Sequence, residues 1–162
     1  FLFEPLAAWA VNLDKRLVKA PKIHLVDSGL AAHLAGYSAD RLRADMPFLG
    51  HLLESFVVSE LRKQLSWSMI RAVPYHFRAV TGQEVDVVLE ASDGRVVGVE
   101  VKAASSVGSK DFAGLETLFR ACGEKLVRGI VLYQGTQVVP FGRFLAIPLS
   151  VLWRTVAAGA TK

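Results

Sequence analysis

The alternation of apolar and charged residues from Gln83 to Lys102 predicts a β-hairpin around which the rest of the chain is organised. Two alternating runs flank Asp93-Gly94, a pair that is typical of tight hairpin turns. A two-residue loop would mix apolar and charged residues on both faces. A three-residue loop, Ser92-Asp93-Gly94, with Gly94 in the left-handed conformation, gives one uniformly apolar face, so we expect the longer loop.

The longer loop fixes which side chains share a face of the hairpin. Asp86 is then expected opposite Glu100, and Glu84 opposite Lys102. Neighbouring carboxylates repel each other unless a proton or a cation lies between them, so we expect compensation from Lys102 and from a divalent cation such as Mg²⁺. The alternative is a solvated strand face, because a Glu-x-Lys spacing is common by chance. The apolar face is expected to consist of Val85, Val87, Leu89, Val97, Val99 and Val101.

A long helix is predicted after Pro47, because apolar residues recur there at spacings of three and four. Glu54 lies at the edge of this apolar stripe, where a carboxylate can point across into a cleft. Glu60 lies as close to the stripe and is a competing candidate. The alternative for both is an exposed helix acid. The stripe consists of Leu49, Leu52, Leu53, Phe56, Val57, Leu61 and Leu65.

The remaining pattern predicts one strand before the hairpin, then a helix and further short strands after it. Gly123 is expected to end the later helix, and a brief helix capped by Asp27 or Ser28 is expected near the start of the chain. The expected strands are 23–26, 73–78, 127–133, 138–141 and 144–147, and the expected helices are 29–34, 109–122 and a closing one within 148–157. This order predicts an α/β (α+β) domain.

Composition limits the class of protein. The chain has 162 residues, of which 52% are hydrophobic, and a mean hydropathy of +0.35. No apolar run approaches the ~18 residues of a bilayer span, so we expect no membrane segment and an apolar surface that a partner or a missing domain covers. The first residue is Phe1 rather than Met, which indicates a piece of a longer protein. A single cysteine, Cys122, excludes an internal disulfide and a cysteine-based zinc site and fits a cytoplasmic setting.

A net charge of +4 permits a polyanionic partner. Lys15, Arg16, Lys19 and Lys22 form a short basic run near the N-terminus. Such a run is most often a solvated face, and contact with phosphates is the minority alternative. The nearby His24 is expected to be structural.

The positions of Glu54 on the first long helix, Asp86 on the second strand and Glu100-Val101-Lys102 on the third resemble the PD-(D/E)xK nuclease superfamily. Within it the chain resembles the DUF4143 family, the C-terminal domain of a class of prokaryotic AAA-type ATPases. The resemblance covers nearly the whole chain. The Pro of the superfamily motif is Val85 here, which weakens the specificity of the motif. The segments that carry the resemblance are 12, 15–22, 26–31, 50–61, 77–78, 84–86 and 100–102.

The resemblance implies a restriction-endonuclease-like αβββαβ core, with a mixed sheet flanked by helices, in residues 37–162. Residues 1–36 would be an N-terminal extension from a winged-helix region and an ATPase domain that are missing here. Any ATP binding would belong to that missing domain, since these residues contain no G-x-x-x-x-G-K-[ST] loop.

The resemblance also implies roles for single residues. Asp86, Glu100 and the Val101 carbonyl would hold one or two Mg²⁺ (or Mn²⁺) ions, and Glu54 would complete or orient that site. Lys102 would position the attacking water or stabilise charge on the phosphate. Arg78 and the basic run would grip the DNA backbone.

The implied function is therefore metal-dependent hydrolysis of DNA. A catalytically inactive nuclease fold that serves an ATPase by docking DNA, by assembly or by sensing substrate is the alternative, since fold does not determine function. The joint presence of Asp86, Glu100 and Lys102 favours the nuclease. Homo-oligomerisation is left open by the sequence.

Overall fold

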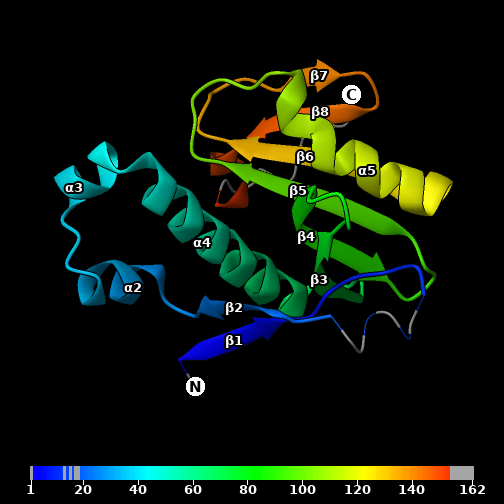
Figure 1. Ribbon diagram of the computed structural model, residues 1–162, viewed down its shortest axis with the longest axis horizontal. Helices are drawn as coiled ribbons and strands as arrows, with labels where there is room; N and C mark the ends of the chain where they lie inside the picture. Colours follow the sequence, from blue (N-terminus) through cyan, green and yellow to red (C-terminus); the bar gives the residue numbers. More distant parts are fainter. Residues whose placement is uncertain (1, 13, 15, 17–18, 154–162) are drawn as a thin grey trace.

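A six-stranded mixed sheet with a helix against each face forms the centre of the computed structural model, which describes residues 2–12, 14, 16 and 19–153 (Figure 1). The strand order is β3-β4-β5-β6-β8-β7. The three strands β3, β4 and β5 are antiparallel neighbours, whereas β6 runs parallel to both β5 and β8. The strands are β3 (Ala72–Arg78), β4 (Glu84–Ala91), β5 (Val96–Lys102), β6 (Leu126–Tyr133), β7 (Val139–Phe141) and β8 (Phe144–Pro148).

The hairpin of β4 and β5 has the expected three-residue loop. Val87 pairs with Val99 and Leu89 pairs with Val97, which is the register that this loop requires. Gly94 has a φ of 82°, a value that a residue with a side chain adopts only with strain. The prediction of register and turn is confirmed.

The prediction of one continuous apolar face is wrong at Val85. Val87 and Val99 pack on the side of the long helix, whereas Val85 packs with the cluster on the opposite side of the sheet. The pairing with β3 shifts between Tyr75↔Val88 and Phe77↔Val85, so that two residues of β4 oppose one residue of β3. This β-bulge interrupts the alternation at Asp86, so the preceding residue, Val85, points to the opposite side of the sheet from Val87.

The long helix α4 (Met46–Trp67) covers one face of the sheet, and α5 (Ala113–Cys122) covers the other. The Asp45 carboxylate caps α4 by accepting a hydrogen bond from the Phe48 N–H at 3.0 Å, and Pro47 lies in the first turn, where no backbone donor is needed. The helix α5 follows a 3₁₀ turn (Ser109–Phe112) and ends at Gly123, which has a φ of 58°. Both helices are confirmed.

The N-terminal segment packs against this core. Strands β1 (Phe3–Leu6) and β2 (Lys22–Leu25) form a separate antiparallel ribbon beside α4 and β3 (Figure 1). The Leu6 side chain is fully buried in the same cluster as the α4 residues Val57 and Val58. Two short helices, α2 (Ser28–Leu34) and α3 (Ala39–Ala44), connect the ribbon to α4, and α3 was not expected from the pattern.

The end of the chain is described only in part. A 3₁₀ turn (Leu149–Leu152) follows β8, and the remainder of the expected closing helix lies outside the described residues. Within the described part, none of the helices has both the length and the apolar character that crossing a bilayer requires.

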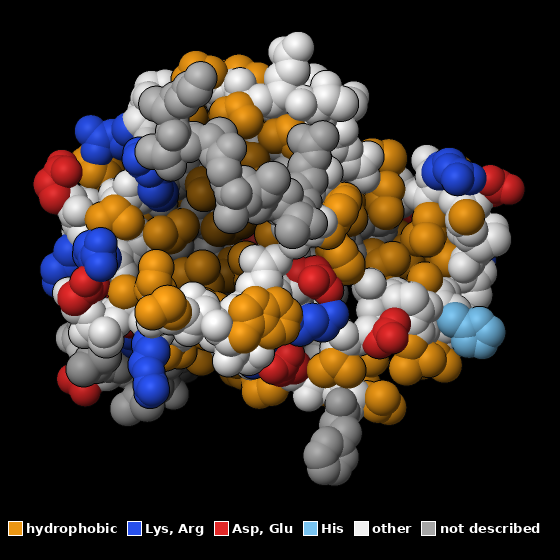
Figure 2. Space-filling view, turned by 180° about the vertical axis from the view of Figure 1, so that it is seen from behind, with side chains coloured by type: hydrophobic (Ala, Val, Ile, Leu, Met, Phe, Trp, Pro, Cys, Tyr) orange, Lys and Arg blue, Asp and Glu red, His pale blue; other side chains and the backbone are white. Residues whose placement is uncertain are grey.

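Figure 2 shows many exposed apolar side chains with charged ones scattered among them. The most exposed apolar residues of the N-terminal half include Phe3, Leu34, Trp67, Met69 and Val80. Part of the chain's apolar content therefore lies on its surface.

Replacing Gly114 with Ala is expected to lower the free energy of unfolding by about 1–3 kcal/mol. An added Cβ would overlap the backbone carbonyl of Glu84, so α5 would have to move away from β4. Chemical denaturation measures the change. Gly108→Ala is the control, because no atom lies within 4 Å of its added Cβ, and it is expected to change stability by less than about 0.5 kcal/mol. Equal stabilities of the two variants would contradict this close approach of α5 and β4.

Candidate functional site

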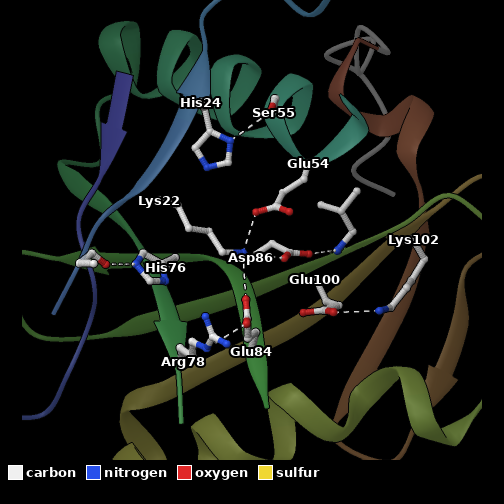
Figure 3. A network of polar contacts seen from close by, with 12 residues as sticks. Lys22, His24, Glu54, Ser55, His76, Arg78, Glu84, Asp86, Glu100 and Lys102 are labelled. Atoms are coloured by element: carbon white, nitrogen blue, oxygen red, sulfur yellow. Dashed lines mark hydrogen bonds and ion pairs between the residues drawn. The ribbon is translucent and has the colours of Figure 1, made fainter. Parts of the chain in front are cut away.

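Three carboxylates from two elements surround the ammonium group of Lys22 (Figure 3). The Lys22 Nζ lies 2.7 Å from Glu54 Oε1, 3.2 Å from Glu84 Oε2 and 3.4 Å from Asp86 Oδ1. Glu54 comes from α4, Glu84 and Asp86 come from β4, and Lys22 comes from β2. Segments that are far apart in the sequence therefore meet at one cation.

The β-bulge explains how Asp86 reaches this cluster. The β4–β5 pairing ends at Val87↔Val99, and Asp86 is the next residue of β4. Its Oδ2 accepts a hydrogen bond of 2.9 Å from the Val101 N–H, while its Oδ1 faces Lys22. The carboxylate thus bridges the backbone of β5 and the N-terminal ribbon.

Glu100 and Lys102 form a second ion pair in the same region. The Lys102 Nζ lies 2.9 Å from Glu100 Oε1. The other oxygen, Glu100 Oε2, is buried and has no hydrogen-bond partner among the described residues. A buried carboxylate oxygen normally has a partner, so this atom is open to a donor or a cation. Glu84 is not opposite Lys102 as expected, because it pairs with Lys22 and with Arg78 at 3.1 Å.

Burial and mutual repulsion both disfavour the charged forms of the two central acids. Burial raises the pKa of Asp86, and the charge of Glu54 raises it further. Burial likewise raises the pKa of Glu100, and the charge of Asp86 adds to the effect. The same surroundings favour the charged forms of the two lysines. Burial works against their charge, but the surrounding carboxylates raise the pKa of both Lys22 and Lys102.

These side chains line a hollow of about 490 Å³ between β2, α4 and the sheet. Its walls include Lys22, His24, Glu54, Asp86 and Glu100. In the described ranges, no group of three or more His, Cys, Asp or Glu residues is arranged to hold a metal ion. The Lys22 ammonium lies among three of the four acids. The Asp86 and Glu100 carboxylates still fit a hard cation in chemistry, and the unpartnered Glu100 Oε2 is a free ligand atom.

The structure separates the two helix acids that competed for a place in the site. Glu54 contacts Lys22 at the hollow, whereas Glu60 pairs with Lys63 at 2.6 Å along the helix surface. Val101 contributes its N–H to Asp86, and the metal-binding role of its carbonyl stays a prediction.

The residues that were expected to bind nucleic acid and that the structure describes contact other parts of the chain. The Arg16 guanidinium makes two hydrogen bonds to Glu90, at 2.5 and 2.9 Å, and lies over the rings of Trp9 and Tyr75. It therefore clamps the N-terminal segment to the hairpin. The exposed Arg78 pairs with Glu84, the Lys19 Nζ donates to the Arg78 carbonyl at 2.8 Å, and Lys15 lies outside the described residues.

Sequence reasoning missed two contributions of β2 to this hollow. Lys22 was expected on a solvated basic face or at phosphates, and His24 was expected to be structural. Neither was expected to line a hollow with the acids. The His24 side chain is 5% exposed, with Nδ1 3.1 Å from Ser55 Oγ and Nε2 without a partner in the described structure. The signal that could have found them is the spacing of Lys22 and His24, because alternate residues of a strand share one face.

The fold and the site together define this chain as an α/β domain with a partly buried acidic site at the end of a bulged hairpin. The chain belongs to the DUF4143 family, a domain of unknown function, whose model matches residues 49–152. Residues 1–41 match a second domain of unknown function, DUF8612.

Relatives extend this similarity. The chain is 35% identical over 102 residues to the uncharacterized protein Rv2008c of Mycobacterium tuberculosis and to the uncharacterized protein Mb2031c of Mycobacterium bovis. Each alignment covers 62% of this chain and 22% of the relative, so the chain spans less than a quarter of the length of the curated relatives it matches.

The stability of the protein is expected to depend on His24 at acidic pH. Burial, together with the positive charges of Lys22 and Arg62, lowers the pKa of His24 from 6.5 to about 4. The unfolded state therefore binds more protons between these two values, so stability falls by up to about 3 kcal/mol as the pH drops through them.

His24→Gln is expected to flatten this part of the pH dependence. Urea denaturation across the window measures it, and the exposed His33→Gln is the matched control that should leave the profile unchanged. Parallel profiles for wild type and His24→Gln would rule out a buried neutral histidine.

Proposed function

We propose that this domain hydrolyses phosphodiester bonds of DNA with Mg²⁺ or Mn²⁺ bound at Asp86 and Glu100. The observation that carries the proposal is the convergence of Asp86, Glu100 and Lys102 at one end of the β4–β5 hairpin, with Glu100 Oε2 buried and unpartnered. The pKa values of both acids are raised by burial and by neighbouring negative charge, and acids with perturbed pKa values are concentrated at functional sites.

The order of the elements supports a restriction-endonuclease-like core. The long helix α4 is followed by three antiparallel strands, then by α5 and by the parallel strand β6. This is the αβββαβ order that the resemblance implies. The strand order around β5 brings the acids of β4 and β5 together beside α4, from which Glu54 reaches them.

The proposal assigns a role to each of four residues of the site. Asp86, fixed by the Val101 N–H, would bind the metal together with Glu100, and Glu54 would orient the site. When bound, the metal would lower the pKa of its water and neutralise phosphate charge. The Lys102 side chain is 33% exposed, and its ammonium would hold the attacking water or the phosphate oxygen.

The wider context is also a proposal. The curated relatives are roughly three times as long as this chain, since the same 102 residues are 62% of this chain and 22% of each relative. The additional length leaves room for the ATPase and winged-helix regions that would bind ATP and position this domain on DNA in the cytoplasm. The second candidate is a catalytically inactive DNA-docking or assembly module. The ion pairs of Lys22 favour it, because they neutralise acids that would otherwise be available to a metal.

Asp86→Asn and Lys102→Ala are each expected to lower the rate of DNA cleavage at least about a hundredfold. Asp86→Asn removes a charged metal ligand, and Lys102→Ala removes a positive charge that would act on the reacting phosphate. Cleavage of supercoiled and linear DNA in Mg²⁺ or Mn²⁺ measures the rates. Glu54→Gln is expected to lower the rate, whereas Glu60→Gln, on the same helix but away from the hollow, should not.

Cleavage that survives Asp86→Asn and Lys102→Ala together would show that the nuclease site lies elsewhere. DNA binding without cleavage by the wild-type protein, in either metal, would favour the docking module.

A further inference from the structure

The Lys22 ammonium has the surroundings of a bound cation. Three carboxylate oxygens lie within 3.4 Å of its Nζ, which matches the three N–H donors of an ammonium group. Its side chain is 24% exposed, so the charge faces the hollow as well as the acids. Figure 3 shows the Lys22 side chain reaching toward Asp86 between Glu54 and Glu84.

The position of Lys22 in the chain is also informative. Lys22 belongs to β2, which pairs only with β1 among the described strands and is not part of the main sheet. Lys102, in contrast, is on the same strand as its partner Glu100. The cation that neutralises Glu54 and Asp86 is therefore delivered by the N-terminal ribbon.

We propose that Lys22 is a built-in competitor of the metal ion, so that metal binds when the ammonium of β2 releases Asp86. The inference rests on the proposed function, since it concerns the same carboxylates. The Asp86 Oδ2 atom accepts from the Val101 N–H, so a metal ion would need the Oδ1 atom, which lies 3.4 Å from the Lys22 Nζ. Two positive charges beside one carboxylate oxygen repel each other strongly in a partly buried site. The lysine stabilises the metal-free site, and it sets how much metal the site requires.

The competition has a structural consequence for the ribbon. Lys22 pairs directly with Leu6 in the β1–β2 ladder, and Leu6 is fully buried against α4. The ribbon is thus held by apolar packing when the ammonium moves, so release requires rotation of the lysine side chain and leaves β2 in place. Metal affinity becomes a property of this chain's own N-terminal segment.

Binding of Mn²⁺ alone, measured by calorimetry at neutral pH, tests the inference. Lys22→Met is expected to bind Mn²⁺ about tenfold or more tightly than wild type, because the competing charge is removed. Lys22→Arg keeps the positive charge, so its affinity for Mn²⁺ is expected to stay as weak as that of the wild type. Lys63→Met is the matched control, since Lys63 pairs with Glu60 on the helix surface and should leave the affinity unchanged.

A second measurement uses the unmodified protein, so that misfolding of a variant does not decide the result. Amine-reactive labelling with peptide mapping is expected to show that Lys22 is protected without metal and reacts several-fold faster with saturating Mn²⁺. The reactivity of Lys63 should not change.

The outcomes separate this inference from the proposed function. Equal Mn²⁺ affinity of wild type and Lys22→Met, or weaker binding by Lys22→Met, overturns the competition and leaves the nuclease proposal intact. Tighter binding by Lys22→Met without any DNA cleavage supports the competition and overturns the nuclease. Absence of Mn²⁺ binding in wild type and in Lys22→Met overturns both.

Discussion

The attraction between the Lys22 ammonium and its three carboxylate partners is the interaction on which the arrangement of this site depends. Moving ions out of water costs several kcal/mol each, so buried acids persist only where opposite charges and hydrogen bonds compensate. Asp86 has both, from Lys22 and from the Val101 N–H. Because Lys22 lies on the ribbon and its partners lie on α4 and β4, the same attraction joins the N-terminal segment to the core.

The bulge in β4 determines where that charge is placed. In an uninterrupted strand, Asp86 and Val87 would point to opposite faces, and Asp86 would share a face with Val88. The extra residue lets Val87 remain in the α4 cluster while Asp86 reaches Lys22 beside it. On the other face, the close approach of Gly114 to the Glu84 carbonyl brings the start of α5 to the same end of β4. Both helices therefore constrain β4, the strand that carries Asp86.

The local features of this fold could be predicted from the sequence, whereas the long-range ones could not. The turn at Gly94 and the stripe of α4 depend on residues within a few positions of each other, and both were confirmed. The bulge at Asp86 depends on how β3 is aligned with β4, which no pattern within β4 reveals. The partners of Lys22 depend on the pairing of β2 with β1 and on its packing beside α4, so a basic run gave no indication of them.

Two lysines from different strands neutralise the acids of this site. Lys102 is two residues from Glu100 on one strand, so their pairing forms whenever β5 forms. Lys22 meets Asp86 only when ribbon, helix and sheet are assembled. Burial raises the pKa of Asp86 and of Glu100 even though an ammonium group lies close to each, so it favours a proton on these acids. In the proposed metal site, a proton, the Lys22 ammonium and a metal ion would compete for the same oxygens, and the ammonium is the competitor whose position the fold itself controls.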